Sequence, residues 1–146
     1  MLAHKEEYIT VRALQDIDTG DAVVFNYENF TTPVRTEPVV IKSVANPALG
    51  GKYCHGVAVQ DVAANELVTV RLATAGTLSV KTDWTGLLYP GTHIYPGEVT
   101  DGVLATTGDN ANIIGLYVGS DVLPESDSGS CIEVLILRLS AVYVDL

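Results

Sequence analysis

The sequence predicts an all-β fold, either a small antiparallel β-barrel or a sandwich-like domain. Short runs along the chain alternate between apolar and polar side chains, which is the period of a half-buried strand. Gly, Pro, Asn and Asp interrupt these runs at short intervals, and no stretch has the 3.6-residue period of a helix. At 146 residues, the length favours a single domain spanning residues 1–146 with its own core.

The N-terminal residues 1–14 predict an extended arm followed by an edge strand. Residues 1–7 are polar, and residues 8–14 alternate as a strand does. Turn residues at 16–21 precede a second strand at 22–25. A polar loop at 26–36 then leads to a short strand at 38–42, whose leading proline suits a strand start or an edge.

Residues 56–80 form the clearest strand pattern in the chain. Three alternating runs, 56–60, 66–72 and 77–81, are joined by short polar or small-residue links. In the middle run Val68, Val70 and Leu72 point one way, and Thr69 and Arg71 point the other. Because links of this length join adjacent antiparallel strands, we expect a β-meander.

The C-terminal half predicts further short strands separated by long loops. Pro-Gly pairs at 90–91 and 96–97 bracket residues 92–95, and the Asp-, Ser- and Gly-rich loop is residues 119–130. The run at 131–139 is apolar on both faces, which predicts a strand covered on both sides. The other expected strands are residues 103–106, 113–118 and 141–145.

A weak internal echo relates the two halves. The order Gly-x-x-aliphatic-aromatic, Gly-aliphatic-x-Val and a long strand occurs from Gly20, Gly56 and residues 67–72, and again from Gly91, Gly115 and residues 132–137. The gaps between these segments differ. Both an internal repeat and ordinary recurrence among β-proteins fit the pattern.

Composition restricts the classes of partner. The chain has 18 Asp and Glu against 8 Lys and Arg, a net charge of −10, and its few basic residues are scattered, which disfavours direct nucleic-acid binding. No apolar run approaches a membrane helix, and the N-terminus lacks an export-signal pattern, so we expect neither a membrane partner nor export. A mean hydropathy of +0.26 favours burial of apolar surface between subunits of an oligomer.

No constellation of residues predicts catalysis, a cofactor or a metal. Residues 127–129 spell Asp-Ser-Gly as around a trypsin-like serine nucleophile, but the flanks and histidines do not fit that family. Asp16, Asp18 and Asp21 fail the calcium-loop spacing, and Asp-capped turns explain them better. We therefore expect a non-enzymatic protein with no catalytic, cofactor or metal residues.

The two cysteines and two of the histidines do not have the spacing of a zinc site. Cys54 and His55 are adjacent and would face opposite sides of a strand, and His93 and Cys131 have no finger spacing. Cys54 and Cys131 are predicted to be free thiols, with a disulfide between them as the alternative.

The order of four segments resembles the capsid cement, or head decoration, proteins of tailed bacteriophages. The segments are residues 19–24, 56–72, 90–95 and 114–118. They are similar to that family's Gly-Asp-x-Val opening, its Gly-Val-Ala-x-x-Asp-Ala-Ala-x-Gly-Glu-x-Val-Thr-Val centre, its later Gly-Asp-x-Val-Tyr and its Gly-x-Ala strand. The resemblance covers about residues 8–139. Asn65 stands where the family has Gly, and Gly91-Thr92 stands where it has a second Gly-Asp.

The resemblance implies a structural virion protein on the capsid exterior, present in the host cytoplasm during assembly. It implies binding to the major capsid protein, stabilisation of the head and self-association as a homotrimer. The N-terminal arm would pair with capsid-protein strands. The residues expected to make this contact are Leu2, His4, Tyr8, Ile9 and Val11.

The alternative is a head-fibre or tail-associated β-module that binds a host surface ligand. An exposed cluster of Trp84, Tyr89 and Tyr95 around a groove would favour such a module, because aromatic side chains form platforms for sugars and peptides. Core or interface packing of these aromatics is the competing interpretation.

Overall fold

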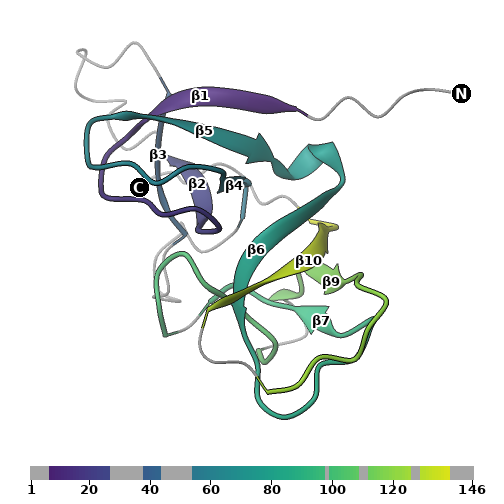
Figure 1. The fold of residues 1–146 in the computed structure, drawn as a ribbon. Helices are drawn as coiled ribbons and strands as arrows, with labels where there is room; N and C mark the ends of the chain where they lie inside the picture. Colours follow the sequence, from purple (N-terminus) through teal and green to yellow (C-terminus); the bar gives the residue numbers. More distant parts are fainter. Residues whose placement is uncertain are drawn as a thin grey trace, which may run out of the picture.

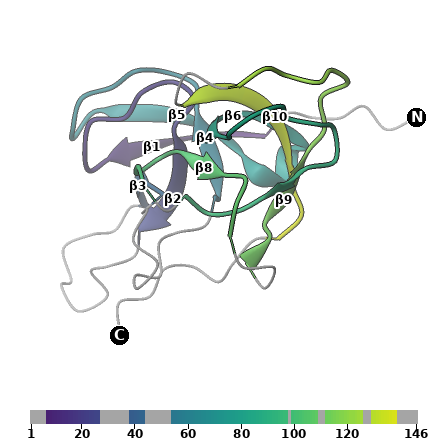
Figure 2. The same cartoon turned by 90° about the horizontal axis from the view of Figure 1, so that it is seen from below.

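The computed structural model describes residues 7–26, 38–43, 54–97, 99–108, 112–125 and 129–138. The predicted arm residues 1–6 and the predicted strand at 141–145 lie outside these ranges. Within them the chain is built from β-strands and a single turn of 3-10 helix, which confirms the predicted all-β fold. Two barrel-like units are present, one above the other in Figure 1 and largely side by side in Figure 2.

The first barrel is a closed ring with the strand order β1-β3-β2-β4-β5. Its inward-facing side chains alternate along each strand and form a separate core that includes Val11, Val23 and Val68. Pairing is antiparallel throughout except between β1 and β3, which run parallel. The strands are β1 (Tyr8–Ala13), β2 (Ala22–Asn26), β3 (Val39–Lys42), β4 (Gly56–Ala58) and β5 (Leu67–Leu72).

The second barrel has the strand order β7-β9-β10-β6-β8. An isolated bridge between Tyr95, which directly follows β7, and Ala105 of β8 connects the two ends of this order. The ring is therefore closed through one short contact. The elements are the 3-10 turn η1 (Ala73–Ala75) and the strands β6 (Thr77–Asp83), β7 (His93–Ile94), β8 (Leu104–Ala105), β9 (Gly115–Tyr117) and β10 (Ser130–Ile136).

The predicted β-meander over residues 56–80 is wrong in its last step. β4 and β5 do pair antiparallel, and Val68 and Val70 are buried as expected. However, β5 pairs with β1 and β4, whereas β6 pairs with β10 and β8. The link at Ala73–Ala75 forms a helical turn and directs β6 away from the first barrel into the second (Figure 1).

The internal echo corresponds to a structural repeat. Strands β1 to β5 match β6, β7, β8, β9 and β10 in the same pairing scheme and chain order, including the single parallel pair, β1 with β3 and β6 with β8. The match extends to individual backbone hydrogen bonds. Gly20 N donates to Ala58 O at 2.9 Å and Gly91 N to Tyr117 O at 2.8 Å, while His55 N donates to Val23 O and Ile114 N to Ile94 O, both at 2.9 Å.

Equivalent backbone positions in the two barrels also share their special conformations. Gly20 and Gly91 have φ of 90° and 89°, and Asn65 and Gly129 have φ of 71° and 75°. L-residues other than Asn and Asp rarely adopt this region, so a glycine or an asparagine is needed there. Asn65 stands where the cement-protein pattern has glycine, and both residue types are compatible with a φ of 71°.

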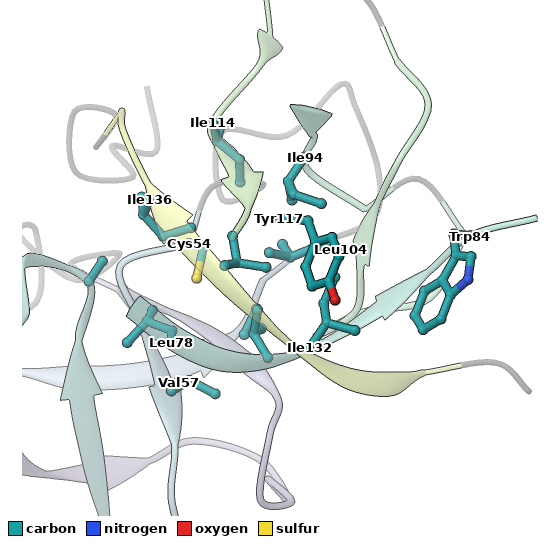
Figure 3. Packing of buried hydrophobic residues seen from close by; sticks show 14 of the residues in the cluster. Cys54, Val57, Leu78, Trp84, Ile94, Leu104, Ile114, Tyr117, Ile132 and Ile136 are labelled. Carbon is teal, nitrogen blue, oxygen red and sulfur yellow. The ribbon is translucent and has the colours of Figure 1, made fainter. Parts of the chain in front are cut away.

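The core of the second barrel continues into the first. One hydrophobic cluster joins Ala22, Cys54 and Val57 of the first barrel to second-barrel residues such as Leu78 and Ile132 (Figure 3). β4 makes this possible because Val57 faces the second barrel while Ala58 faces the interior of the first. The two barrels therefore share buried apolar surface, which couples their stabilities.

The expectation that the strand at 131–139 is covered on both faces is wrong for β10. Ile132, Val134 and Ile136 are buried, whereas Cys131 and Glu133 on the other face are exposed and Leu135 is half-buried. Leu137, beyond the strand end, is also exposed. β10 therefore has one buried face and one largely exposed face, as is common in antiparallel sheets.

A buried carboxylate links the two barrels. Asp21 Oδ1 accepts a hydrogen bond from Lys81 Nζ of β6 at 2.8 Å, and Lys42 Nζ lies 3.7 Å from Oδ2. Burial alone would lower the pKa of Lys81, but the hydrogen bond and charge of Asp21 outweigh it and raise that pKa. Backbone bonds beside Asp21, from Ala22 N to Gly102 O and from Lys81 N to Gly20 O, tie the same junction.

Candidate functional site

The predicted capsid-contact residues fall partly on β1. Leu2 and His4 lie outside the described residues. Tyr8 is 49% exposed, whereas Val11 is 3% exposed and Ile9 packs against the first-barrel core. Of the three, only Tyr8 has a largely exposed side chain, because alternation turns Ile9 and Val11 inward.

β1 is an edge strand over only part of its length, which corrects the prediction for residues 1–14. Its ladder with β5 runs from Tyr8 to Arg12, but its ladder with β3 covers only Arg12 and Ala13. Leu14 N also bonds to Val40 O at 3.1 Å. The C-terminal end of the strand is therefore inside the closed ring and is not available to a strand added by a partner.

The aspartate-rich turn at 16–21 is a capped turn, as predicted. Asp18 N donates to Asp21 Oδ2 at 2.8 Å, and Asp16 Oδ1 accepts from Ala64 N at 2.9 Å. Thr19 N donates to Asp61 Oδ1 at 2.7 Å, and this bond holds the pKa of Asp61 below its usual value. Among the described residues, no group of three or more His, Cys, Asp or Glu side chains is placed to hold a metal ion.

Among the described residues, the cysteines and histidines do not come together as a zinc site. Cys54 is buried, and its Sγ donates to Gly56 O; burial raises the pKa of this thiol to about 12. Cys131 is exposed on the outer face of β10, and both cysteines are free, so the alternative of a disulfide is not realised. His55 stacks on Phe25, with 6.0 Å between the ring centroids, and its Nδ1 accepts a hydrogen bond from Phe25 N at 3.1 Å.

Trp84, Tyr89 and Tyr95 do not form an exposed aromatic cluster. Trp84 is 8% exposed and Tyr95 is 7% exposed. Trp84 lies at one end of the second-barrel core (Figure 3), and its Nε1 donates to Pro124 O at 2.9 Å. Of the three, only Tyr89 has its ring at the surface, so the arrangement that would favour a glycan platform is absent from these residues.

Sequence reasoning missed a surface that the structural repeat makes visible. In the second barrel Leu88 bridges Leu123, and in the first barrel Ile17 bridges Val62 at the equivalent place. In both, the bridging residues exchange two backbone hydrogen bonds of 2.8–3.0 Å, so their neighbours in sequence share the opposite, outward face. Alignment of residues 16–18 with 87–89 would have pointed to this face.

The outward faces of the two bridges differ in chemistry. The first barrel presents Asp16, Asp18, Asp61 and Ala63, which we call the acidic tip. The second presents exposed Leu87, Tyr89, Val122 and Pro124, which we call the apolar tip. The loops that carry the apolar tip run next to each other at the foot of the second barrel in Figure 1, at the end of the molecule opposite β1.

Comparisons with known proteins give a fold relationship. No protein-family model matches the chain, and no curated protein matches it. In the described residues no helix is long and apolar enough to span a membrane.

The solved structures include one whose fold matches that of this chain over nearly the whole sequence. It is the crystal structure of the head fiber gp8.5 N base in bacteriophage phi29, which is similar to this chain with a TM-score of 0.60 and 18% sequence identity. The match covers 97% of this chain and 100% of the phi29 chain. At this identity the similarity establishes a shared fold.

Proposed function

We propose that the chain is a non-enzymatic structural protein of a tailed-phage virion, bound to the outside of the head through the major capsid protein. The observation that carries the proposal is the full-length fold match to a head fiber base. The segments that resemble cement proteins, including the Gly56 and Gly115 strands, support the same location independently. A homotrimer could contact several equivalent sites on the head exterior at once, so modest contacts per chain would add up to a high avidity.

Two roles on the head follow from these two lines of support. As a cement protein, the chain would hold neighbouring capsomers together and stabilise the shell through binding energy. As a head-fibre base, the role suggested by the phi29 similarity, it would attach a projecting element. We propose the cement role first, because residues 19–24, 56–72, 90–95 and 114–118 resemble segments of the cement proteins in the same order.

The test of head binding uses purified heads that lack the protein. We expect the full chain to co-sediment with these heads and to appear on their outer surface by electron microscopy. Cement activity predicts that decorated heads retain their genome to a higher temperature than bare heads. Binding with no change in that temperature would favour the fibre-base role, and no binding would refute the proposal.

The arm is tested by deleting residues 1–6, the part of the predicted contact that precedes the barrel. Deletion to residue 10 would also remove the Tyr8 to Thr10 ladder with β5, so loss of binding could then reflect unfolding. We expect the shorter deletion to leave the fold intact and to abolish most head binding. Unchanged binding would refute the role of the arm.

Sedimentation of the full chain tests the expected homotrimer. A mass other than that of three chains would refute it.

A further inference from the structure

The apolar tip differs in chemistry from the equivalent site in the first barrel. Leu87 is 57% exposed, Tyr89 55% and Val122 48%, while the bridging Leu88 beneath them is buried. Where the first barrel carries three aspartates, the second carries leucine, tyrosine and valine. The acidic tip shows that this backbone geometry accepts polar residues, so folding alone does not require the exposed apolar side chains.

The Leu88–Leu123 bridge brings the four residues of the apolar tip together from two loops. Because Leu88 and Leu123 are a hydrogen-bonded pair, Tyr89 lies across from Val122 and Leu87 lies across from Pro124 on the outward face. The loop behind them is fixed, since Trp84 Nε1 bonds to Pro124 O and Tyr117 Oη bonds to Asp121 O at 2.8 Å. A surface held in place in this way loses little conformational freedom on binding.

The charges around the apolar tip indicate the kind of partner. Exposed carboxylates, Asp121 and Glu125, flank Val122 and Pro124 along the chain, and the whole protein carries a net charge of −10. A symmetric contact between two copies through this face would place each copy's carboxylates against those of the other. A partner with an apolar centre and a rim of Lys or Arg would instead pair its basic residues with these carboxylates.

We propose that the apolar tip is a second docking surface for the phage shell, which it contacts through an apolar patch bordered by basic residues. The proposal rests on the proposed function for the identity of the partner. β1, which follows the predicted arm in the chain, and the apolar tip lie at opposite ends of the molecule (Figure 1). One molecule therefore has two separate contacts with which to span neighbouring positions on the shell.

The test compares two matched double variants of the full chain on purified heads that lack the protein. Leu87→Ser/Val122→Ser removes apolar surface from the tip. Leu67→Ser/Val59→Ser removes a leucine and a valine of similar exposure, 52% and 40%, from the first barrel. We expect the tip variant to bind heads at least about tenfold more weakly and the control to bind within about twofold of wild type.

A second experiment tests the carboxylates Asp121 and Glu125 that flank the apolar tip. Asp121→Asn/Glu125→Gln should reduce the dependence of head binding on salt concentration, because these carboxylates would no longer pair with basic residues of the shell. An unchanged salt dependence would refute the charge argument. Trp84 emission monitors folding, and Leu87→Ser alone, expected to weaken binding at least about threefold, replaces the double variant if that emission changes.

The remaining outcomes separate the possible failures. Head binding by the tip variant equal to wild type overturns the apolar tip as a shell contact while leaving the proposed function in place. A tip variant that changes the sedimentation mass of the free protein, with head binding per oligomer unchanged, shows that the surface joins copies and also overturns it. Failure of the wild-type chain to bind heads overturns the proposed function and the apolar-tip proposal together.

Discussion

Asp21 is the residue on which the junction of the barrels depends most. Its side chain is 3% exposed and carries the charge that pairs Lys81 and Lys42, and it also accepts the Asp18 N–H. Removing it leaves a backbone donor without its acceptor and two lysines without their counter-charge. Both lysines are about a quarter exposed, so water compensates for part of that loss.

We expect Asp21→Ala to lower the free energy of unfolding by about 2–4 kcal/mol in urea denaturation. Asp18→Ala is the control, since that side chain is exposed in the same turn and its cost should stay near about 0.5 kcal/mol. Equal effects of the two substitutions would show that the junction does not depend on the buried carboxylate.

His55 makes stability sensitive to mild acid. Burial lowers its pKa from 6.5, and Nδ1 must be unprotonated to accept the Phe25 N–H. The unfolded chain then binds more protons than the folded one below pH about 6.5, so stability is full above that pH and falls as the pH drops toward the lowered pKa. We expect the urea midpoint of the wild type to decrease between pH 7.5 and 5.5.

The matched variant is His55→Asn, whose amide oxygen can accept the same backbone hydrogen without titrating. Its urea midpoint should decrease measurably less over this pH interval. A wild-type and a variant profile that run in parallel would assign the acid sensitivity to other groups.

Among the elements, the short strands β4 and β9 each begin at a glycine for the same steric reason. A Cβ on Gly56 would lie 2.6 Å from Arg71 O, and one on Gly115 would lie 2.5 Å from Leu135 O. These oxygens belong to the equivalent neighbouring strands β5 and β10, and backbone yields little. The glycines in the sequence echo therefore mark a close approach between strands.

We expect Gly56→Ala and Gly115→Ala each to lower the free energy of unfolding by about 1–3 kcal/mol, the cost of overpacking. The two costs should be similar, because the contacts are equivalent. Thr10→Ala, at an exposed position of β1, is the control and should stay within about 1 kcal/mol. Denaturant unfolding of all three variants measures this, and a tolerated alanine at either glycine would contradict the steric argument.

Strand positions could be predicted from the sequence because alternation and turn residues are local signals. The runs at 8–14, 22–25 and 38–42 each correspond to a strand. The β4–β5 pair could be predicted from its short link, but the partners of β6 could not, because β6 alternates identically whether it joins β5 or β10. Likewise, residues 8–14 carry no local sign that their end pairs in parallel with β3, and Leu87 and Val122 become neighbours only through the Leu88–Leu123 bridge.

At the scale of the whole molecule, the shared cluster predicts that both barrels unfold together. Ala22, Cys54 and Val57 of the first barrel pack with the second-barrel core, so neither barrel can open without exposing apolar surface of the other. Trp84, the only tryptophan, reports on the second barrel, and far-UV circular dichroism reports on both. We expect the two signals to follow one coincident urea transition, and a second transition seen only by circular dichroism would contradict this coupling.

The ring closure of both barrels has a further consequence for the protein in concentrated solution. A strand at the edge of an open sheet exposes unpaired amide and carbonyl groups, which template pairing with strands of other molecules. Here the first barrel closes fully and the Tyr95–Ala105 bridge joins the ends of the second. In the described part of the chain, the strands of both rings therefore pair mainly with one another, and crowded copies have few places at which to begin forming cross-β aggregates.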